Sequence, residues 1–308
     1  MLSNYHASID LANENNSHSC VLGMIGHNKR VLEAGCASGH VSEVLHARGC
    51  SVVGVEIDQS VTGSAEQWLE RLIIADFDDG TFAKELDGES FDAILFGDVL
   101  EHLKDPLATL RQSVEFLSAS GVVVISVPNI THADVKIALM NGQFPYSDSG
   151  LLDRTHIHFF TKESLLELVK DAGLVPVEIC RITAPVFSTE VGVQPGDVSD
   201  DVLAAIMSDL ESETYQFVVK TVRDNGTRAL DDMATQLVDL TDRLRDATRK
   251  NEALTTQLDA LNAQFIHLTS LHDSDTRELE HMRGQINLVK RFLPMPLIRF
   301  VRGLLTSR

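Results

Sequence analysis

The stretch of sequence that decides the fold is VLEAGCASGH, residues 31–40. A short apolar run leads to Glu33, and five small residues, Gly35 to Gly39, follow it. Small residues between a strand and a helix let a bound ligand approach the backbone closely. A carboxylate at Glu33 would repel the pyrophosphate of a dinucleotide and attract an amino group. The stretch therefore favours a ligand that carries an ammonium group and no phosphate at this turn.

On both sides of this turn, apolar runs alternate with helical patterns. Strands are predicted at residues 30–34, 51–57, 71–76, 91–97, 121–127, 175–182 and 214–222. Helices are predicted at residues 40–48, 106–117, 162–172 and 198–210. Continuous Val, Ile and Leu runs are typical of strands buried on both faces, so we expect an α/β domain with helices on both faces of a mostly parallel sheet.

A heptad repeat begins after Asn225-Gly226 and predicts a long C-terminal coiled coil. With Leu230 at position a, fifteen of the eighteen a and d positions up to Val289 are apolar. About sixty helical residues at about 1.5 Å each would extend about 90 Å, too far to lie on this domain. We therefore expect residues 225–290 to join copies of the chain, as a parallel homodimer in which Asn251 pairs with its twin; leucine at both a and d leaves a trimer open.

Charge is distributed unevenly along the 308 residues. Residues 1–224 carry 14 basic and 34 acidic residues, a net charge of −20, whereas residues 289–308 carry five basic residues and no acidic one. The acidic part argues against nucleic acid as a partner. The basic amphipathic tail, residues 291–308, is predicted to contact anionic lipid or to fold back on protein.

Four separate cysteines without a CxxC pair argue against disulfides and a zinc site. The N-terminus shows no apolar secretory segment, and no apolar run is long enough to span a membrane. We therefore expect a cytoplasmic protein, held at the inner face of the membrane if the tail binds lipid.

The turn and the acids that follow it make residues 17–222 resemble a class I S-adenosylmethionine-dependent methyltransferase with a Rossmann-like sheet. The first motif of that family is an acid followed by GxGxG, and here Ala37 replaces the middle glycine. The resemblance implies S-adenosyl-L-methionine as the cofactor and an antiparallel last strand at the sheet edge. It implies these cofactor-binding residues: Glu33, Gly35, Cys36 and Gly39 at the turn; Glu56 for the ribose and Ile57 for the adenine face; Asp76 and Phe77 for the adenine N6 side; and Gly97 and Asp98 for the methionine side.

The acceptor is expected over the strand ends, between residues 128 and 160. The sequence LLDRTHIHFFT, residues 151–161, resembles that of methyltransferases of bacterial surface-glycan clusters. This resemblance implies a sugar hydroxyl as the methyl acceptor. A hydroxyl needs a base for its proton, and the candidates are Asp153, His156 and His158, with His156 preferred and Asp153 or Arg154 positioning the sugar. The alternative is that these histidines only cap the helix that Thr161 begins.

Two further alternatives stay open at this stage. Glu101, His102 and His156 resemble a metal-binding arrangement of other O-methyltransferases and would hold Mg²⁺; the favoured interpretation has no metal and lets Glu101 and His102 hold the loop by hydrogen bonds. The chain as a whole is predicted to be an enzyme, a glycan or small-molecule methyltransferase. The rival hypothesis is a non-catalytic adaptor that organises a complex through its coiled coil.

Overall fold

The protein is described by a computed structural model that covers residues 11–224 and, nearer the C-terminus, residues 240–241, 243–245, 247–251, 254–266, 279–285 and 287. Two compact units divide the chain, residues 1–242 and residues 243–308. The domain boundaries predicted at 224/225 and 290/291 border or lie among residues outside this description, and they stay predictions.

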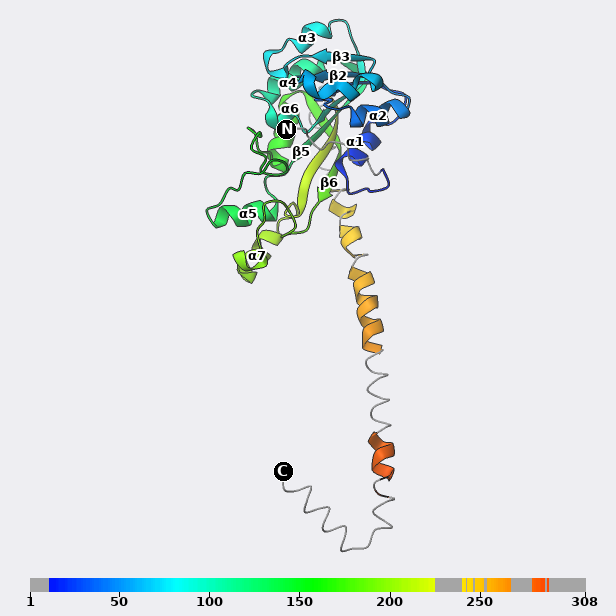
Figure 1. Ribbon diagram of the computed structural model, residues 1–308, viewed down its shortest axis with the longest axis vertical. Coiled ribbons are helices and arrows are strands. Elements are labelled where there is room, and N and C mark those ends of the chain that lie inside the picture. The colour runs from blue at the N-terminus through cyan, green and yellow to red at the C-terminus, as the bar shows by residue number, and fades with distance from the viewer. Residues whose placement is uncertain are drawn as a thin grey trace. The chain divides into compact units, whose positions relative to one another are not determined.

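The first unit is built on a seven-stranded mixed sheet (Figure 1). Its strands are β1 (Arg30–Ala34), β2 (Ser51–Glu56), β3 (Arg71–Ile74), β4 (Phe91–Gly97), β5 (Leu117–Pro128), β6 (Leu174–Thr183) and β7 (Thr214–Arg223). Their order across the sheet is β3-β2-β1-β4-β5-β7-β6, and β1 to β5 pair in parallel. The Rossmann-like sheet predicted from the sequence is confirmed.

The last strand departs from the prediction in its position. β7 runs antiparallel to its neighbours, as expected, but it lies between β5 and β6 rather than at the edge, which β6 forms. The side chains of Phe217 and Val218 are consecutive and both fully buried. Because consecutive strand residues point to opposite faces, a strand with both faces buried suits the interior of the sheet better than its edge.

Helices cover both faces of the sheet. The helices are α1 (Ser17–Ile25), α2 (His40–Ala47), α3 (Phe82–Glu85), α4 (Pro106–Val114), α5 (Ala133–Met140), α6 (Lys162–Asp171) and α7 (Asp200–Met207). α1 and α2 pack on one face, against residues such as Val31, Leu95 and Val218. α3, α4 and α6 pack on the other face, against Leu32 and Phe96 among others. Alternate residues of β1 and β4 thus supply the two cores, which fixes the register of these strands.

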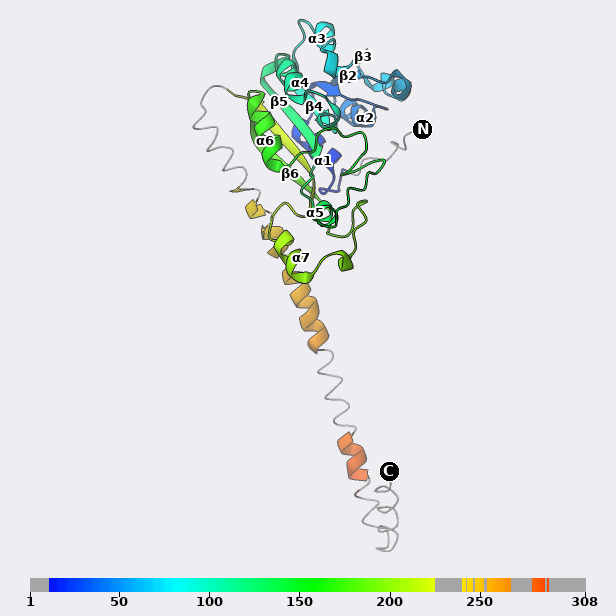
Figure 2. The same cartoon turned by 90° about the vertical axis from the view of Figure 1, so that its left-hand side faces the viewer.

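The sequence pattern missed α1 and α5. α1 begins after Asn16, whose side chain accepts a hydrogen bond from the Ser19 amide and caps the helix. α5 lies within the connection 128–160 and forms a third apolar cluster with loop residues and α7, beyond one end of the sheet (Figure 2). The long connection is therefore a packed element beside the ends of the strands, where the acceptor was expected.

The expectation of no disulfide is wrong in this structure. Cys20 of α1 and Cys180 of β6 are bonded, with their Cα atoms 6.5 Å apart, while Cys36 and Cys50 are free and buried. The two bonded cysteines are 160 residues apart in sequence, so only the folded sheet brings them together. Near them, the Asn15 side chain bonds the Thr183 backbone at both N–H and C=O, so the start of α1 is held to the end of β6 twice.

The second unit is helical where it is described, including residues 254–266 and 279–285. Among the described residues from 240 onward, eight heptad residues are exposed by 45–69%: Leu240, at the end of the first unit, and Leu244, Leu254, Leu258, Leu261, Phe265, Leu279 and Met282. The described residues are thus helical with an uncovered apolar stripe, and the coiled coil itself stays a prediction. No helix among the described residues combines the length and hydrophobicity that crossing a bilayer requires. The tail, residues 291–308, lies outside the described residues.

Candidate active site

The turn after β1 has the close approach that its small residues predict. Gly35 and Gly39 adopt left-handed backbone angles, φ 67° and 83°. A Cβ atom at Gly39 would lie 2.6 Å from the Cα atom of Ala65, and one at Gly35 would lie 2.8 Å from a methyl carbon of Val99. Ala37, which replaces the middle glycine, keeps a left-handed angle (φ 44°), at a cost of roughly 1–2 kcal/mol for a residue with a Cβ atom.

Glu56 ties this turn to the end of β2. One of its carboxylate oxygens accepts a hydrogen bond from the Ala37 amide at 3.0 Å, and the other accepts from the amides of Ile57 and Asp58 at 2.9 and 3.0 Å. The side chain is only 8% exposed. These bonds fix the carboxylate at the carboxyl end of β2, where ligands bind in open α/β sheets.

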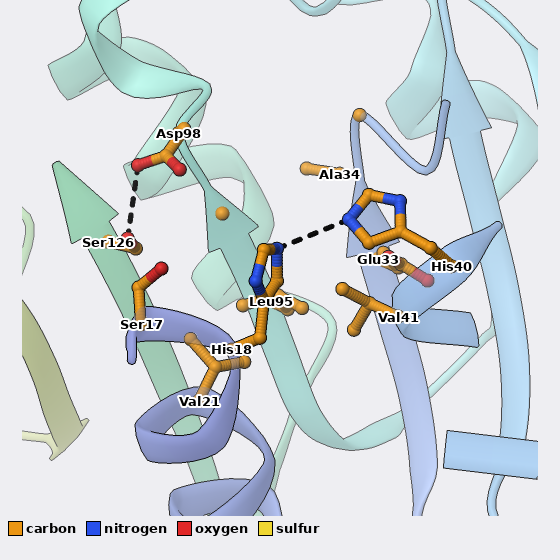
Figure 3. A pocket seen from close by; sticks show the side chains of 12 residues that line it. Ser17, His18, Val21, Glu33, Ala34, His40, Val41, Leu95, Asp98 and Ser126 are labelled. Atoms are coloured by element: carbon orange, nitrogen blue, oxygen red, sulfur yellow. Dashed lines mark hydrogen bonds between the residues drawn. The ribbon is translucent and has the colours of Figure 1, made fainter. Parts of the chain in front are cut away.

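A pocket opens at the carboxyl ends of β1 and β4 (Figure 3). Its floor comes from the turn and the strand ends, with Glu33, Gly35, Gly97 and Asp98 among its lining residues, and Ser17, His18 and Val21 of α1 line it as well. The remaining lining residues are Ala34, His40, Val41, Leu95 and Ser126. The structure thus brings together four of the predicted cofactor-binding residues, two from the turn and two from the methionine side.

Two acids, Glu33 and Asp98, give the pocket its charge. Burial raises the pKa of Glu33 to about 7, although the Ser42 hydroxyl donates to its carboxylate at 2.5 Å. Desolvation of its carboxylate also raises the pKa of Asp98 to about 6, although the residue as a whole is exposed, and against hydrogen bonds donated by Ser126 at 3.0 Å and by the Gln216 amide at 2.5 Å. A bound ammonium group would stabilise the ionised form of both acids. The pocket is therefore suited to a cationic group.

The adenine side is more open, and its predicted residues differ in their surroundings. Ile57 is 65% exposed and can pack on a flat ring. Asp76 caps the short 3₁₀ turn Phe77–Asp79 by accepting from the Asp78 amide at 2.8 Å. Phe77 belongs to the apolar core, with its ring 4.5 Å from that of Phe82, centre to centre. Cys36 is also buried, with its sulfur close to Gly54. Phe77 and Cys36 are therefore buried behind the cofactor site.

A second group of polar side chains lies beside Asp98. Glu101, His102 and His156 each place one ligand atom within 4.8 Å of the others. Both carboxylate oxygens of Glu101 are buried and have no hydrogen-bond partner among the described residues, whereas its carbonyl accepts from the amides of Ile157 and His158 at 2.9 and 3.0 Å. The carboxylate therefore does not hold the loop, which contradicts the favoured sequence interpretation for this side chain.

The pKa values of this group follow from its burial. Burial, and next the charge of Asp98, raise the pKa of Glu101 well above its ordinary value. Burial and the charge of His102 lower the pKa of His156, so its imidazole is neutral at pH 7. A neutral imidazole is the form that accepts a proton or binds a metal ion.

The other two candidate bases, Asp153 and His158, are engaged in local polar contacts. One carboxylate oxygen of Asp153 accepts from both the amide and the hydroxyl of Thr155, at 2.7 and 2.6 Å, which makes a tight turn. His158 lies 3.3 Å from the Lys104 carbonyl through its Nε2 atom. Of the three candidates, His156 is the one that the structure places with Glu101 and His102.

Several residues of the pocket were missed by the sequence reasoning. Ser17 and His18 come from α1, which no strand or helix prediction covered, and Ser126 and Gln216 hold Asp98 from β5 and β7. His40 follows Gly39 directly, so the turn motif pointed to its position without indicating a role. Only the folded sheet places these side chains near Glu33.

A mixed sheet of this order, a small-residue turn after β1 and an acid at the end of each strand beside β1 are typical of the S-adenosylmethionine-dependent methyltransferases. The chain belongs to the methyltransferase domain family, which matches residues 17–179, more than half of its 308 residues. S-adenosylmethionine, predicted from the sequence, is the cofactor of this class.

Among curated proteins, the chain is similar to ubiquinone biosynthesis O-methyltransferases. It is 31% identical over 153 residues to that of Cereibacter sphaeroides and 30% identical to that of Dinoroseobacter shibae, covering 48% of this chain and 61% of each relative. The chain thus spans about six-tenths of the length of these relatives. A solved S-adenosylmethionine-dependent methyltransferase from Archaeoglobus fulgidus shares the fold, with a TM-score of 0.50 at 19% identity over 69% of this chain and 94% of that one.

Proposed function

We propose that this chain is an O-methyltransferase that moves the methyl group of S-adenosylmethionine to a hydroxyl group of a small acceptor. The observation that carries the proposal is the group Glu101, His102 and His156 beside Asp98 of the cofactor pocket. In such a transfer the acceptor oxygen bonds the methyl carbon, the carbon–sulfur bond breaks, and the hydroxyl loses its proton. A group of neutral and acidic side chains next to the methyl donor suits the removal of that proton.

The relatives support a hydroxyl acceptor, because they are O-methyltransferases. Their role in ubiquinone biosynthesis favours a hydroxyl on an aromatic ring over the sugar hydroxyl predicted from the sequence. The similarity to enzymes of surface-glycan clusters finds no support in these relatives. A sugar hydroxyl of a glycan or glycolipid precursor therefore stays the second acceptor to test within the same class.

The residues beside Asp98 fit a divalent cation. Glu101 offers a buried carboxylate whose oxygens have no partner among the described residues, and His102 and His156 offer imidazoles. Carboxylate and imidazole ligands together suit divalent ions such as Mn²⁺, Fe²⁺ or Zn²⁺ better than Mg²⁺. A cation held by these three residues would lower the pKa of an acceptor hydroxyl. The sequence favoured no metal, and His102 does contact the loop, with its Nδ1 atom 3.2 Å from the Thr155 carbonyl oxygen; the cation is our proposal.

Removal of the cation gives a direct prediction. Incubation of the full chain with EDTA should reduce methyl transfer by at least about tenfold, and added Mn²⁺ should restore it. Transfer of the labelled methyl group is measured before chelation, after it, and after the ion is returned. Transfer that resists EDTA would contradict the cation and keep His156 as the general base predicted from the sequence.

The acceptor class is tested with a panel of small molecules. Labelled S-adenosylmethionine is incubated with a catechol, with sugar nucleotides and with a primary amine, and the products are identified by mass spectrometry. The proposal expects a methyl ether on the catechol or on a sugar. Methylation of the amine alone would contradict an O-methyltransferase.

The surface that joins two copies of this chain is a separate proposal. We propose that the apolar stripe on residues 230–289 joins two copies of the chain in a parallel dimer. Its support is the run of heptad residues that are uncovered in the described part of the helix. Nonpolar side chains of this size gain about 1.5–3 kcal/mol each when they are fully buried. The same stripe on a second copy of the chain is therefore expected to cover them.

A single charge in the stripe should separate the copies. Leu258→Asp in the full chain is expected to shift sedimentation from dimer to monomer, because it buries a charge at an a position, while Ala260→Asp on the outer face leaves the dimer unchanged. A Leu258→Asp chain that sediments like the unaltered protein would refute this dimer interface. A truncated chain that ends at Asp224 should be monomeric as well.

Three further expectations from the sequence stay predictions. These are the lipid contact of the tail, the lack of a nucleic-acid partner and the cytoplasmic location. The adaptor hypothesis also remains testable. An adaptor would have no need of the buried acid Glu33 in the pocket, since burial of a carboxyl group without a ligand costs free energy.

A further inference from the structure

The cofactor pocket contains acids but no strongly basic side chain. Glu33 and Asp98 line it, and none of its lining residues in the described part of the chain is Lys or Arg. The methionyl end of S-adenosylmethionine carries an ammonium group and also a carboxylate. The two acids suit the ammonium group, but they repel the carboxylate. Some other part of the pocket has to bind that carboxylate.

Few side chains of the pocket lining can donate a hydrogen bond to this carboxylate. Ser126 is engaged with Asp98 and Gln216. The other polar side chains of the lining are Ser17 and His18 in the first turn of α1, and His40, the first residue of α2. Only imidazoles among these can carry a positive charge, and burial lowers the pKa of His18, so the ring gives up its charge easily when no anion is near.

The two histidine rings meet. Their Nε2 atoms are 3.2 Å apart, and the rings are nearly perpendicular, with centroids 5.0 Å apart. Figure 3 shows Asp98 at one side of the pocket and the His18–His40 pair at the other, with the two Nε2 atoms turned toward each other. At this distance one ring donates and the other accepts. An anion that reached the pair would instead find an N–H donor on each ring, by a change of tautomer or by protonation.

We propose that His18 and His40 bind the carboxylate of the methionyl end, across the pocket from Asp98, which faces its ammonium group. The pair comes from two helices, so this contact also joins α1 to α2 across the pocket. The inference rests on the proposed function, because it assumes that S-adenosylmethionine occupies this pocket. It adds two binding residues that the turn motif does not contain.

The test compares two ligands that differ only in the carboxylate. Calorimetric titrations of the full chain use S-adenosylmethionine and decarboxylated S-adenosylmethionine, which keeps the amino group and the sulfonium. The proteins are the wild type, His18→Gln, His40→Gln and the double variant. His27→Gln is the matched control, since His27 is exposed and outside the pocket lining.

The expected result is selective. Each single variant should bind S-adenosylmethionine about tenfold or more weakly, from the loss of one hydrogen bond to a charged group, and should bind the decarboxylated ligand as the wild type does. Unchanged binding of the decarboxylated ligand also shows that the variant is folded. Equal losses for both ligands, or no loss for either, would overturn the assignment. A wild-type chain that binds neither ligand would refute the proposed function itself.

Discussion

Glu56→Ala should weaken S-adenosylmethionine binding by about 100-fold or more. The carboxylate is fixed at the end of β2 by the amides of Ala37, Ile57 and Asp58, and the family resemblance places both ribose hydroxyls on it. Each hydrogen bond to a charged group contributes about 1.5–3 kcal/mol, so the loss of two costs at least about 3 kcal/mol, which corresponds to about 100-fold in affinity. Titration calorimetry of the full chain measures this change.

The neighbouring exposed glutamate provides the control. Glu66 lies in the short 3₁₀ turn Glu66–Trp68 and is exposed. Glu66→Ala removes the same charge near the same site, so it should leave the affinity within about twofold. Circular dichroism of both variants checks the fold, which the change at a strand end should preserve. An affinity unchanged in Glu56→Ala would show that this acid does not contact the ribose.

Glu101→Gln should lower the turnover number by about 100-fold or more and leave the affinity for S-adenosylmethionine nearly unchanged. The substitution keeps the volume of a side chain that is 1% exposed, but it replaces a carboxylate by an amide, which is a poor ligand for a cation. Loss of a group that activates the acceptor hydroxyl typically costs 10²–10⁴-fold, roughly, in rate. Steady-state kinetics with the best acceptor of the panel, together with calorimetry, separates rate from binding.

Two companion variants sharpen this result. His156→Ala should show the same split between turnover and affinity, because His156 belongs to the same group of ligand atoms. Glu115→Gln changes an exposed glutamate just after α4 and should leave both quantities unchanged. Full turnover in both Glu101→Gln and His156→Ala would contradict a role for this group in activating the acceptor, and Asp153 or His158 would then become the first candidates.

The sheet and the cofactor end of the site could be predicted because they depend on local pattern. A strand that is buried on both faces has a continuous apolar run, and the turn after β1 needs small residues where a Cβ atom would collide with Val99 or Ala65. Four of the predicted cofactor-binding residues, Glu33, Gly35, Gly97 and Asp98, do line one pocket. Each of them sits at the carboxyl end of a parallel strand, and those ends meet at one edge.

The remaining features depend on contacts between distant parts of the chain. The Cys20–Cys180 bond, the internal place of β7 and the meeting of His18 with His40 each join segments that no local pattern links. The sequence also could not predict that the Glu101 carboxylate has no hydrogen-bond partner among the described residues. Its sequence neighbours suggest a hydrogen-bonded loop, and only the folded structure shows that its carbonyl, rather than its carboxylate, accepts the bonds from residues 157 and 158.

The central claim is that the pocket at the ends of β1 and β4 binds S-adenosylmethionine for methyl transfer. Titration of S-adenosylmethionine into the full chain, followed by competition with S-adenosylhomocysteine, tests it most directly. We predict saturable binding at one site per chain, displaced by S-adenosylhomocysteine and weakened in Glu56→Ala but not in Glu66→Ala. If no binding is detected up to about 1 mM ligand, the binding free energy is weaker than about 4 kcal/mol. That result would contradict the account and favour the adaptor.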